Sequence, residues 1–576
     1  MKHIGGGREY LLIDLASESW QRNSFGEEEL LLYAGGEALG LALFQSLGDD
    51  EALLLVCGAL TGSTLVGSDS LSIIGRSPAS GLIEAQSMHT PFAQALSALG
   101  VRALVLRHAL RRPMSLHLYN DRLEFRPCEK LVGKGAVSTH HLLLQEGALA
   151  TLTIGPAAEN GALSASIIGD GKRTERSGFG ALFGQKQIKA IVVSESGQPC
   201  IPAQKEAFEQ LQQALGKALA RSPFIQGQKY QGTLVLIPTL QKYGAAAVDA
   251  VTKRTDPRLF HLGPKEWARK HLLVTDFCSG CEYGCTYKVM QSNQESIPLP
   301  SALSVLALGS NIGNYDQDLV LLWHQKALEL GLDPVSSGMI ISSELAKEGN
   351  LSKPIQPKHI EELLEAIAVT KLVLSTKDDH YSVAVGGKPM APYDPRGAWG
   401  QALSVGLGED FPFAAELLLN WVKPASIVSK AELAVLQENL LGIMRSVGLC
   451  PFLMVPLLLE GAFPSLIRPL KKMLAHYPLF VNNLANVNLI ARLLSTFDTV
   501  AFSETDVMNI GRRSAYLKRS LNEGKPAFPA PIPQRFLTDP ESNFAEMKTV
   551  PYRGLVDAYQ FLRMLDIGEL ENDASL

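Results

Sequence analysis

The sequence predicts an α+β protein in which a β-rich N-terminal region precedes a longer, mainly helical part. Short apolar runs close to Gly, Ser or Pro recur over the first ~200 residues, which is typical of strands and turns. Amphipathic patterns of helical period recur after Pro202. A chain of 576 residues is also too long for one hydrophobic core, so about three or four domains are expected.

The strands of the first part follow from period-two alternation and from turn residues. Asn120 and Asp121 separate two alternating segments and are typical of a hairpin turn. A short helix is expected over residues 91–99, and the whole region is expected to form one sheet-based domain. We expect strands over residues 10–14, 53–57, 71–74, 103–106, 115–119, 122–126, 150–154 and 188–193.

The remainder of the chain reads as helices joined by Pro- and Gly-rich connections. The loop over residues 386–392 is a candidate domain boundary, and residues 526–540 form a Pro-rich surface segment that we expect to pack on the body. We expect helices over residues 203–220, 318–330, 360–366, 414–421, 430–447 and 484–494.

Composition excludes several classes of protein. The chain is 46% hydrophobic and 19% charged, as in a compact globular protein. A net charge of −5 and a pI near 6.2 give no electrostatic footprint for nucleic acid. No run of 18 or more apolar residues predicts a membrane span, and the N-terminus lacks the apolar segment of a signal peptide. The expected location is cytoplasmic.

Three cysteines lie within eight residues, in a C-x2-C-x3-C run of Cys278, Cys281 and Cys285. Gly280 and Gly284 allow the tight curl that would point the three thiolates at one centre. A fourth thiolate could come from Cys450, which follows a strong helical pattern far along the chain. The run therefore predicts a [4Fe-4S] cluster held by these four cysteines.

Two other readings of the cysteine run remain open at this stage. Zinc also accepts four cysteines, although zinc sites usually show two C-x2-C pairs. The thiols could also be ordinary buried residues without metal. Cys57, Cys128 and Cys200 stand alone, and Cys57 lies in an apolar run that predicts a core position. Seven cysteines of which three are clustered fit a reducing compartment better than a disulfide framework.

Two predicted helices end in the same way. Residues 326–334 and 444–451 both finish with Gly-Leu-(Asp/Cys)-Pro, so Gly331 and Gly448 stand where a helix C-terminus favours a left-handed residue. Each ending alone is explained as a good helix stop. The repetition, once with Cys450 inside it, predicts two pseudo-equivalent loops that face a shared site.

The chain resembles the aldehyde:ferredoxin oxidoreductase family of tungsten-pterin, iron-sulfur enzymes. The matching segments follow in family order over nearly the whole chain, together with the cysteine run. They are Gly58-Ala-Leu-Thr-Gly62, Gly75-Arg-Ser-Pro-Ala-Ser-Gly81, Ile154-Gly-Pro-Ala-Ala-Glu-Asn160, residues 176–191, Gly331-Leu-Asp333, Tyr393-Asp-Pro-Arg-Gly397 and Gly448-Leu-Cys450.

This resemblance implies an N-terminal β domain over residues 1–203, a helical domain with the cysteine run over 204–390, and a second helical domain with Cys450 over 391–576. It implies tungsten held by two pyranopterins between these domains, with the [4Fe-4S] cluster close by for electron exit to ferredoxin. Cys278, Cys281, Cys285 and Cys450 are similar to the family's cluster ligands. The residues matching its pterin-binding positions are Arg176, Gly178, Gly180, Asp333, Gly448 and Leu449.

The chain departs from the family at the pterin. The family places an aspartate at each helix end to accept hydrogen bonds from the pterin ring, whereas this chain has Leu328 and Arg445. Leucine accepts no hydrogen bond and arginine only donates. An arginine expected near residues 66–71 is missing, with Asp69 added, and Ser87-Met-His-Thr90 replaces a glycine-rich segment. These departures predict that the tungsten-pterin site has been lost.

The family's substrate-side histidine is also missing, because residues 405–413 contain none. Glu295, Glu409, Asp410 and His89 are the candidate substitutes, and each is expected to be a solvated loop residue. The catalytic residues therefore remain unassigned.

Three functions are compatible with this pattern. The first is a redox subunit whose [4Fe-4S] cluster relays electrons, with a ferredoxin or ferredoxin-like subunit, a catalytic paralogue or a second copy of the chain as partner. The second is a functioning tungsten or molybdenum bis-pyranopterin oxidoreductase of aldehydes or carboxylic acids. The third is a non-redox scaffold subunit with a structural cluster or zinc.

Overall fold

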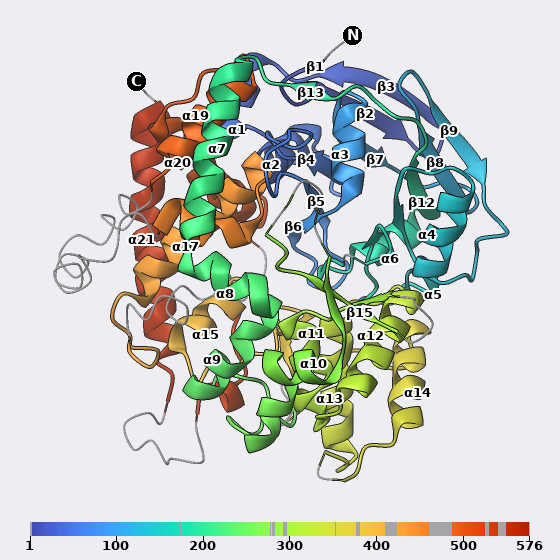
Figure 1. Cartoon of the computed structure of the whole chain (residues 1–576), viewed down its shortest axis with the longest axis vertical. Coiled ribbons are helices and arrows are strands. Elements are labelled where there is room, and N and C mark those ends of the chain that lie inside the picture. Colours follow the sequence, from blue (N-terminus) through green and yellow to red (C-terminus); the bar gives the residue numbers. More distant parts are fainter. Residues whose placement is uncertain are drawn as a thin grey trace.

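The computed structural model shows sheets gathered in one half of the molecule and helices around and below them (Figure 1). This arrangement confirms the α+β class. The structure describes residues 3–172, 174–276, 278, 281, 283–291, 296–351, 353–375, 381–408, 423–459, 486–524, 529–538 and 549–574. Among these residues, no helix combines the length and apolar character that crossing a membrane requires.

A mixed six-stranded sheet forms the first layer of the N-terminal region, in the order β3-β2-β7-β4-β5-β6. The apolar runs of β4, β5 and β7 do not alternate with polar residues because both faces of the sheet are covered there. Leu53 and Leu55 of β4 enter one hydrophobic core, while Leu54 and Val56 enter another with α2. The strands are β2 (Glu9–Asp14), β3 (Ser19–Ser24), β4 (Leu53–Cys57), β5 (Ser70–Arg76), β6 (Ile83–His89) and β7 (Val101–Arg107).

A second sheet of five strands, in the order β11-β10-β12-β8-β9, completes this region. The predicted sheet-based domain thus contains two sheets, and β1 (His3–Ile4) pairs separately with β13 (Cys200–Ile201). Five further strands and six helices belong here: β8 (Met114–Leu118), β9 (Leu123–Pro127), β10 (Ala150–Thr153), β11 (Ile168–Gly169), β12 (Ile188–Val193), α1 (Glu27–Tyr33), α2 (Gly36–Leu47), α3 (Pro91–Ala98), α4 (Ala136–Gln145), α5 (Pro156–Glu159) and α6 (Phe179–Gln185).

The rest of the described chain is mainly helical, as predicted. The predicted helix over residues 430–447 coincides with α17, whereas residues 414–421 lie outside the described residues. The helices are α7 (Lys205–Arg221), α8 (Pro223–Gln231), α9 (Leu236–Tyr243), α10 (Pro264–Lys270), α11 (Ala302–Leu308), α12 (Gln317–Leu330), α13 (Pro334–Lys347), α14 (Pro357–Ala368), α15 (Trp399–Gly406), α17 (Lys430–Val447), α19 (Asn488–Phe497), α20 (Glu504–Ser520) and α21 (Tyr552–Ala574).

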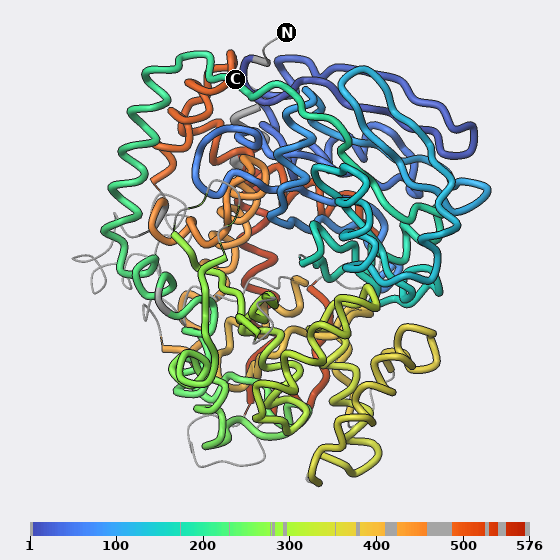
Figure 2. Tube along the Cα trace, turned by 45° about the vertical axis from the view of Figure 1, so that its right-hand side comes forward, coloured from blue at the N-terminus to red at the C-terminus, as the bar shows by residue number. Residues whose placement is uncertain are grey.

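The last helices return to the N-terminal region, so that both chain ends lie at the same end of the molecule (Figures 1 and 2). α17 and α20 pack on α2, and α21 packs on α17. Buried charges join these helices: the Glu438 carboxylate accepts hydrogen bonds from Arg563 at 2.6 Å and Arg519 at 3.0 Å. In the Pro-rich segment, Ala530 donates its N–H to the Gly406 carbonyl at 2.7 Å, which confirms that the described part packs on the body.

Two small β elements interrupt the helical part. One is a three-stranded antiparallel sheet of β14 (Leu273–Thr275), β15 (Tyr287–Met290) and β16 (Ser296–Pro298), which lies at the centre of the molecule in Figure 1. The other is a hairpin of β17 (Ala384–Val385) and β18 (Lys388–Pro389), which occupies the predicted boundary loop.

Candidate functional site

The cysteine run occupies the loop of the β14–β15 hairpin. The loop is closed at its base, because Asp276 donates its N–H to the Thr286 carbonyl at 2.8 Å. Inside the loop, the Cys281 N–H bonds to the Cys278 carbonyl at 3.0 Å. Gly284 has the expected left-handed backbone, with φ of 59°, whereas Gly280 lies outside the described residues. A hairpin therefore presents Cys278, Cys281 and Cys285 together, as their spacing predicts.

Cys450 comes to this loop from the other end of the chain. It follows the C-terminal residue Gly448 of α17, and its N–H donates to the Gly67 carbonyl at 2.8 Å. Gly67 must be a glycine here, because it has φ of +70° and an added Cβ would lie 3.0 Å from the Cys450 Cβ. The backbone of the N-terminal region thus fixes the position of the fourth predicted ligand.

The four thiols lie close enough to influence one another's charge. Burial raises the pKa of Cys450 well above its usual range, and the negative charges of Cys285, Cys278 and Cys281 raise it further. Burial also raises the pKa of Cys281, although hydrogen bonds from the Tyr283 and Gly284 N–H groups act in the opposite direction. All four side chains are half-buried and none forms a disulfide. Such a set holds negative charge favourably only around a cationic centre.

Within the described ranges, no three His, Cys, Asp or Glu side chains are arranged to hold a single metal ion.

The two helix ends meet the N-terminal region in equivalent ways. At the end of α12, the Ser166 N–H bonds to the Gly331 carbonyl at 2.9 Å, and a Cβ on Gly331 would lie 2.5 Å from the Gly155 nitrogen. At the end of α17, the Leu60 N–H bonds to the Val447 carbonyl at 2.8 Å. A Cβ on Gly448 would lie 2.8 Å from the Gly58 Cα. Each helix end therefore lies backbone to backbone against a glycine of the N-terminal region, and both glycines have the predicted positive φ, 73° and 85°.

The side chains at the two altered positions are already engaged within the protein. Leu328 is 3% exposed and packs against Ala136 and Ile168. The Arg445 guanidinium donates to the Glu37 carboxylate of α2 at 3.4 Å, and the other oxygen of Glu37 accepts a hydrogen bond from Ser514 at 2.7 Å. One position thus presents apolar surface to its neighbours, and the other forms an ion pair.

The other predicted pterin-binding residues fall into two groups. Arg176 and Asp333 lie together, with Nε and Oδ2 3.4 Å apart, and Asp333 also begins α13 by accepting the Ser336 N–H at 2.7 Å. Gly178 and Gly180 are explained by close packing, because a Cβ on either would lie within 2.6 Å of the backbone of residues 163–166. Leu449 is fully buried in the main core.

Among the candidate substitutes for the missing histidine, His89 is not a solvated loop residue, and that prediction is wrong. It is the last residue of β6, its side chain is 16% exposed, and its Nδ1 lies 2.7 Å from the Asp69 carboxylate. In the part of the chain that the structure describes, His89 Nε2 is buried without a hydrogen-bond partner. The negative charge of Asp69 also acts on Cys281, so this pair adjoins the cysteine loop. Glu295, Glu409 and Asp410 lie outside the described residues.

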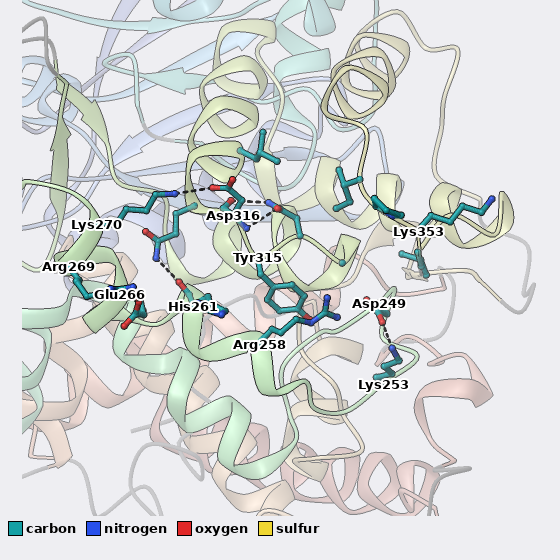
Figure 3. Close-up of a pocket in the computed structure, with 17 residues that line it drawn as sticks. Asp249, Lys253, Arg258, His261, Glu266, Arg269, Lys270, Tyr315, Asp316 and Lys353 are labelled. Atoms are coloured by element: carbon teal, nitrogen blue, oxygen red, sulfur yellow. Dashed lines mark hydrogen bonds and ion pairs between the residues drawn. The ribbon is translucent and has the colours of Figure 1, made fainter.

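A cleft of about 1030 Å³ lies elsewhere in the helical part (Figure 3). No cysteine is among the described residues that line it, and two of its lysines are paired: Lys253 lies 2.6 Å from Asp249 and Lys270 lies 3.1 Å from Asp316. Arg258 covers the ring of Tyr315 at 4.3 Å. This cleft is separate from the predicted cluster ligands.

The Tyr393–Gly397 motif holds a turn in the wall of this cleft. Asp249, Ala250 and Val251 form a left-handed turn with φ of 47°, 55° and 60°, which is strained for residues other than glycine. The Arg396 guanidinium, paired with Asp394 at 2.6 Å, donates to the Val251 carbonyl at 2.8 Å and holds the turn. The motif therefore has a structural task here.

Sequence reasoning missed two ion pairs that join distant segments at these positions. One links Glu37 to Arg445, and the other links Lys172 to Asp276 at 2.8 Å. Burial and opposite charge are the two properties that mark these pairs. Opposite charge alone does not identify them in the sequence, because many residues of the chain are charged.

Models of one protein family match most of the chain: "Aldehyde ferredoxin oxidoreductase, N-terminal domain" over residues 10–195, and "Aldehyde ferredoxin oxidoreductase, domains 2 & 3" over residues 210–567. The tungsten-containing aldehyde ferredoxin oxidoreductase of Pyrococcus furiosus is 25% identical over 497 residues, 78% of this chain and 82% of that protein. The enzyme of the same description from Thermococcus kodakarensis is 25% identical over 496 residues, with the same shares.

One further relative is described as a subunit, and one solved structure has a similar fold. The "Aliphatic sulfonate oxidoreductase, WOR-like subunit" of Pyrococcus furiosus is 23% identical over 387 residues, 59% of each chain. Among solved structures, a chain of the active site complex BamBC of benzoyl coenzyme A reductase, in complex with 1,5-dienoyl-CoA, superimposes with a TM-score of 0.75. The match covers 97% of this chain and 94% of that one at 17% identity, a likeness of fold.

Proposed function

The chain belongs to the aldehyde ferredoxin oxidoreductase family, and from this premise we propose that it is an iron-sulfur redox subunit of that family. Its [4Fe-4S] cluster is held by Cys278, Cys281, Cys285 and Cys450 and transfers electrons within a larger redox complex. The observation that carries the proposal is the meeting of Cys450 with the cysteine hairpin, although they are 165 or more positions apart in the sequence.

The donor set fits such a cluster. Four cysteines are gathered, which is the usual ligation of a [4Fe-4S] centre. When bound, the cluster supplies reversible one-electron chemistry. The protein contributes the positions of the sulfurs, through the closed hairpin loop and the Gly67–Cys450 bond, and the N–H groups of Tyr283 and Gly284 that favour a charged Cys281 sulfur. Hydrogen bonds to sulfur are one of the levers that set a cluster potential.

The tungsten-pterin site is absent in this proposal. A bound pterin would bring ring N–H donors to the two helix ends, where the family has carboxylates. Leu328 and the paired Arg445 offer no acceptor there, and a buried donor without a partner costs about 1–3 kcal/mol. Redox activity then requires a partner that carries the catalytic centre.

The subunit description of one relative supports an assembly. We propose a ferredoxin or ferredoxin-like subunit as electron partner, with a catalytic paralogue or a second copy of this chain as a further component. The proposal retains three domains, over residues 1–203, 204–390 and 391–576, and a cytoplasmic location.

A second candidate is a functioning tungsten or molybdenum pterin oxidoreductase with a rearranged pocket. The Asp69–His89 pair favours it, because Asp69 would hold His89 in one tautomer and leave the buried Nε2 available to a reacting group. In that case His89 replaces the histidine that residues 405–413 lack, and Arg176, Gly178, Gly180, Asp333, Gly448 and Leu449 contribute to cofactor binding.

Replacement of a ligand tests the cluster assignment. We expect Cys281→Ala to abolish the EPR signal that the dithionite-reduced protein gives and to lower its iron content, because metal binding is coupled to folding. Cys128→Ala, which changes a buried cysteine outside the set, should keep both. A Cys281→Ala protein with full iron would contradict the ligand set, and zinc in place of iron in the unmodified protein would select the scaffold function.

A further inference from the structure

An ion-pair bridge ties the cysteine hairpin to the N-terminal region. Asp276, the last residue before the cysteine loop, is 7% exposed and is held by two lysines. Lys172 of the N-terminal region lies 2.8 Å from its Oδ2, and Lys288 of β15 lies 3.1 Å from its Oδ1. Only Lys172 comes from outside the hairpin, so of the two lysines it alone can fix the hairpin relative to the N-terminal region.

The turn that carries Lys172 is itself fixed. Asp170 and Gly171 adopt the left-handed conformation, with φ of 45° and 73°, and the Lys172 N–H closes the turn on the Gly169 carbonyl at 3.1 Å. The Asp170 carboxylate accepts the backbone N–H of Thr151 at 3.0 Å and that of Phe92 at 3.0 Å. A rigid part of the N-terminal region therefore aims the Lys172 ammonium group at the hairpin.

The same N-terminal region fixes Cys450, through the Gly67 carbonyl. The four thiols can converge only if the hairpin and Cys450 are held in one frame. The Gly67 carbonyl holds Cys450 in that frame, and the Lys172–Asp276 ion pair links the hairpin that carries Cys278, Cys281 and Cys285 to it.

The bridge also carries charge. Two ammonium groups around the one carboxylate of Asp276 leave an excess of one positive charge at the base of the cysteine loop. A positive charge stabilises the more negative, reduced state of a neighbouring redox centre. Each lysine should therefore raise the reduction potential of the cluster. Of the two, Lys172 alone should also slow the loss of the cluster from the protein.

We infer that Lys172 is a positioning residue for the [4Fe-4S] centre: through Asp276 it locks the cysteine hairpin to the N-terminal region and raises the cluster potential. This inference rests on the proposed cluster.

The test compares Lys172→Met with Lys288→Met in the full-length, anaerobically purified protein. Methionine retains most of the apolar stem of each lysine and removes the ammonium group, so both variants should fold. Lys172→Arg serves as the conservative variant. Iron per chain, the rate of iron loss to a chelator and the midpoint potential from an EPR-monitored redox titration are measured for each.

We expect Lys172→Met to lose iron about tenfold faster than the unmodified protein, the usual scale for a residue that orients metal ligands. Lys288→Met should lose iron at the unmodified rate, and both methionine variants should show a lower midpoint potential. Lys172→Arg should retain slow loss and the original potential.

An unmodified rate of loss in Lys172→Met, or equal acceleration in Lys288→Met, would overturn the inference while leaving the cluster in place. Absence of iron from the unmodified protein would instead overturn the proposed function.

Discussion

The ends of α12 and α17 have the same backbone conformation but carry different side chains. Gly331 and Gly448 end their helices in the same left-handed conformation, and each lies against a glycine of the N-terminal region. Two residues on, the first end carries Asp333, which begins the next helix, and the second carries Cys450, which faces three other thiols. The two helix ends therefore repeat one backbone arrangement, and a single side chain at each end, Asp333 or Cys450, gives it a different role.

The comparison extends to the positions three residues before each glycine. Leu328 fills an apolar contact with Ala136 and Ile168, whereas Arg445 pairs with Glu37. Two different kinds of neighbour thus engage the side chains at two equivalent positions. This difference supports the proposal that a shared requirement, acceptors for a pterin, no longer constrains either position.

Substitution of the helix-end glycines should have the largest effect on stability. Gly331→Ala and Gly448→Ala combine a strained positive φ with a clash against backbone, so each should cost about 3 kcal/mol. Gly349→Ala is the matched control, because Gly349 has φ of +67° but open space around its Cβ position. It should cost about 1 kcal/mol. Denaturant unfolding checks all three, and equal losses at Gly331 and Gly349 would refute the packing account.

Restoring the family's aspartate at position 328 should lower the stability of the protein by a similar or smaller amount. Leu328→Asp places a carboxylate against Ala136 and Ile168, and without a pterin to bind it should lower stability by about 3 kcal/mol. Leu322→Asp, on the exposed side of the same helix at 43% exposure, should change stability by less than about 0.5 kcal/mol. A Leu328→Asp protein as stable as the original would indicate that donors occupy this pocket.

The smallest effect on stability should come from a change of pH, and it should arise at the end of α12 only. Burial raises the pKa of Glu175 to about 8, and the charge of Asp333 adds to this, although the N–H groups of Ser177, Ile167 and Gly180 favour the ionised form. A raised pKa means that the folded state holds the proton more tightly. The stabilisation is therefore complete below the usual value of 4.5 and is lost as pH rises through about 8.

Melting temperatures of the unmodified protein should consequently fall by several degrees between pH 6 and pH 9. Glu175→Gln cannot titrate and should show a clearly smaller fall. Identical pH profiles for the two proteins would mean that Glu175 is already ionised in the folded state.

The sequence predicts those parts of the molecule that depend on local pattern. The fold class, α17, β4 and the gathering of Cys278, Cys281 and Cys285 in one loop all follow from periodicity or spacing within short segments. The Gly-Leu-x-Pro context likewise predicts Gly331 and Gly448 as left-handed helix ends, and their φ values of 73° and 85° confirm it.

The rest depends on contacts between distant residues. Lys172 and Asp276 are 104 positions apart, and Glu37 and Arg445 are 408 apart, so neither pair has a local signal. The sequence predicts a solvated loop position for His89, but Asp69, the residue before the paired strand β5, lies 2.7 Å from its ring and the side chain is only 16% exposed. Contacts between side chains of distant segments determine the surroundings of these residues. The spacing of residues in the sequence does not reveal such contacts.

Metal and pterin analysis of the anaerobically purified protein tests the central claim most directly. The account predicts about four iron atoms per chain, with neither tungsten, molybdenum nor pterin. Stoichiometric tungsten or molybdenum with pterin, or a protein without iron, would contradict it.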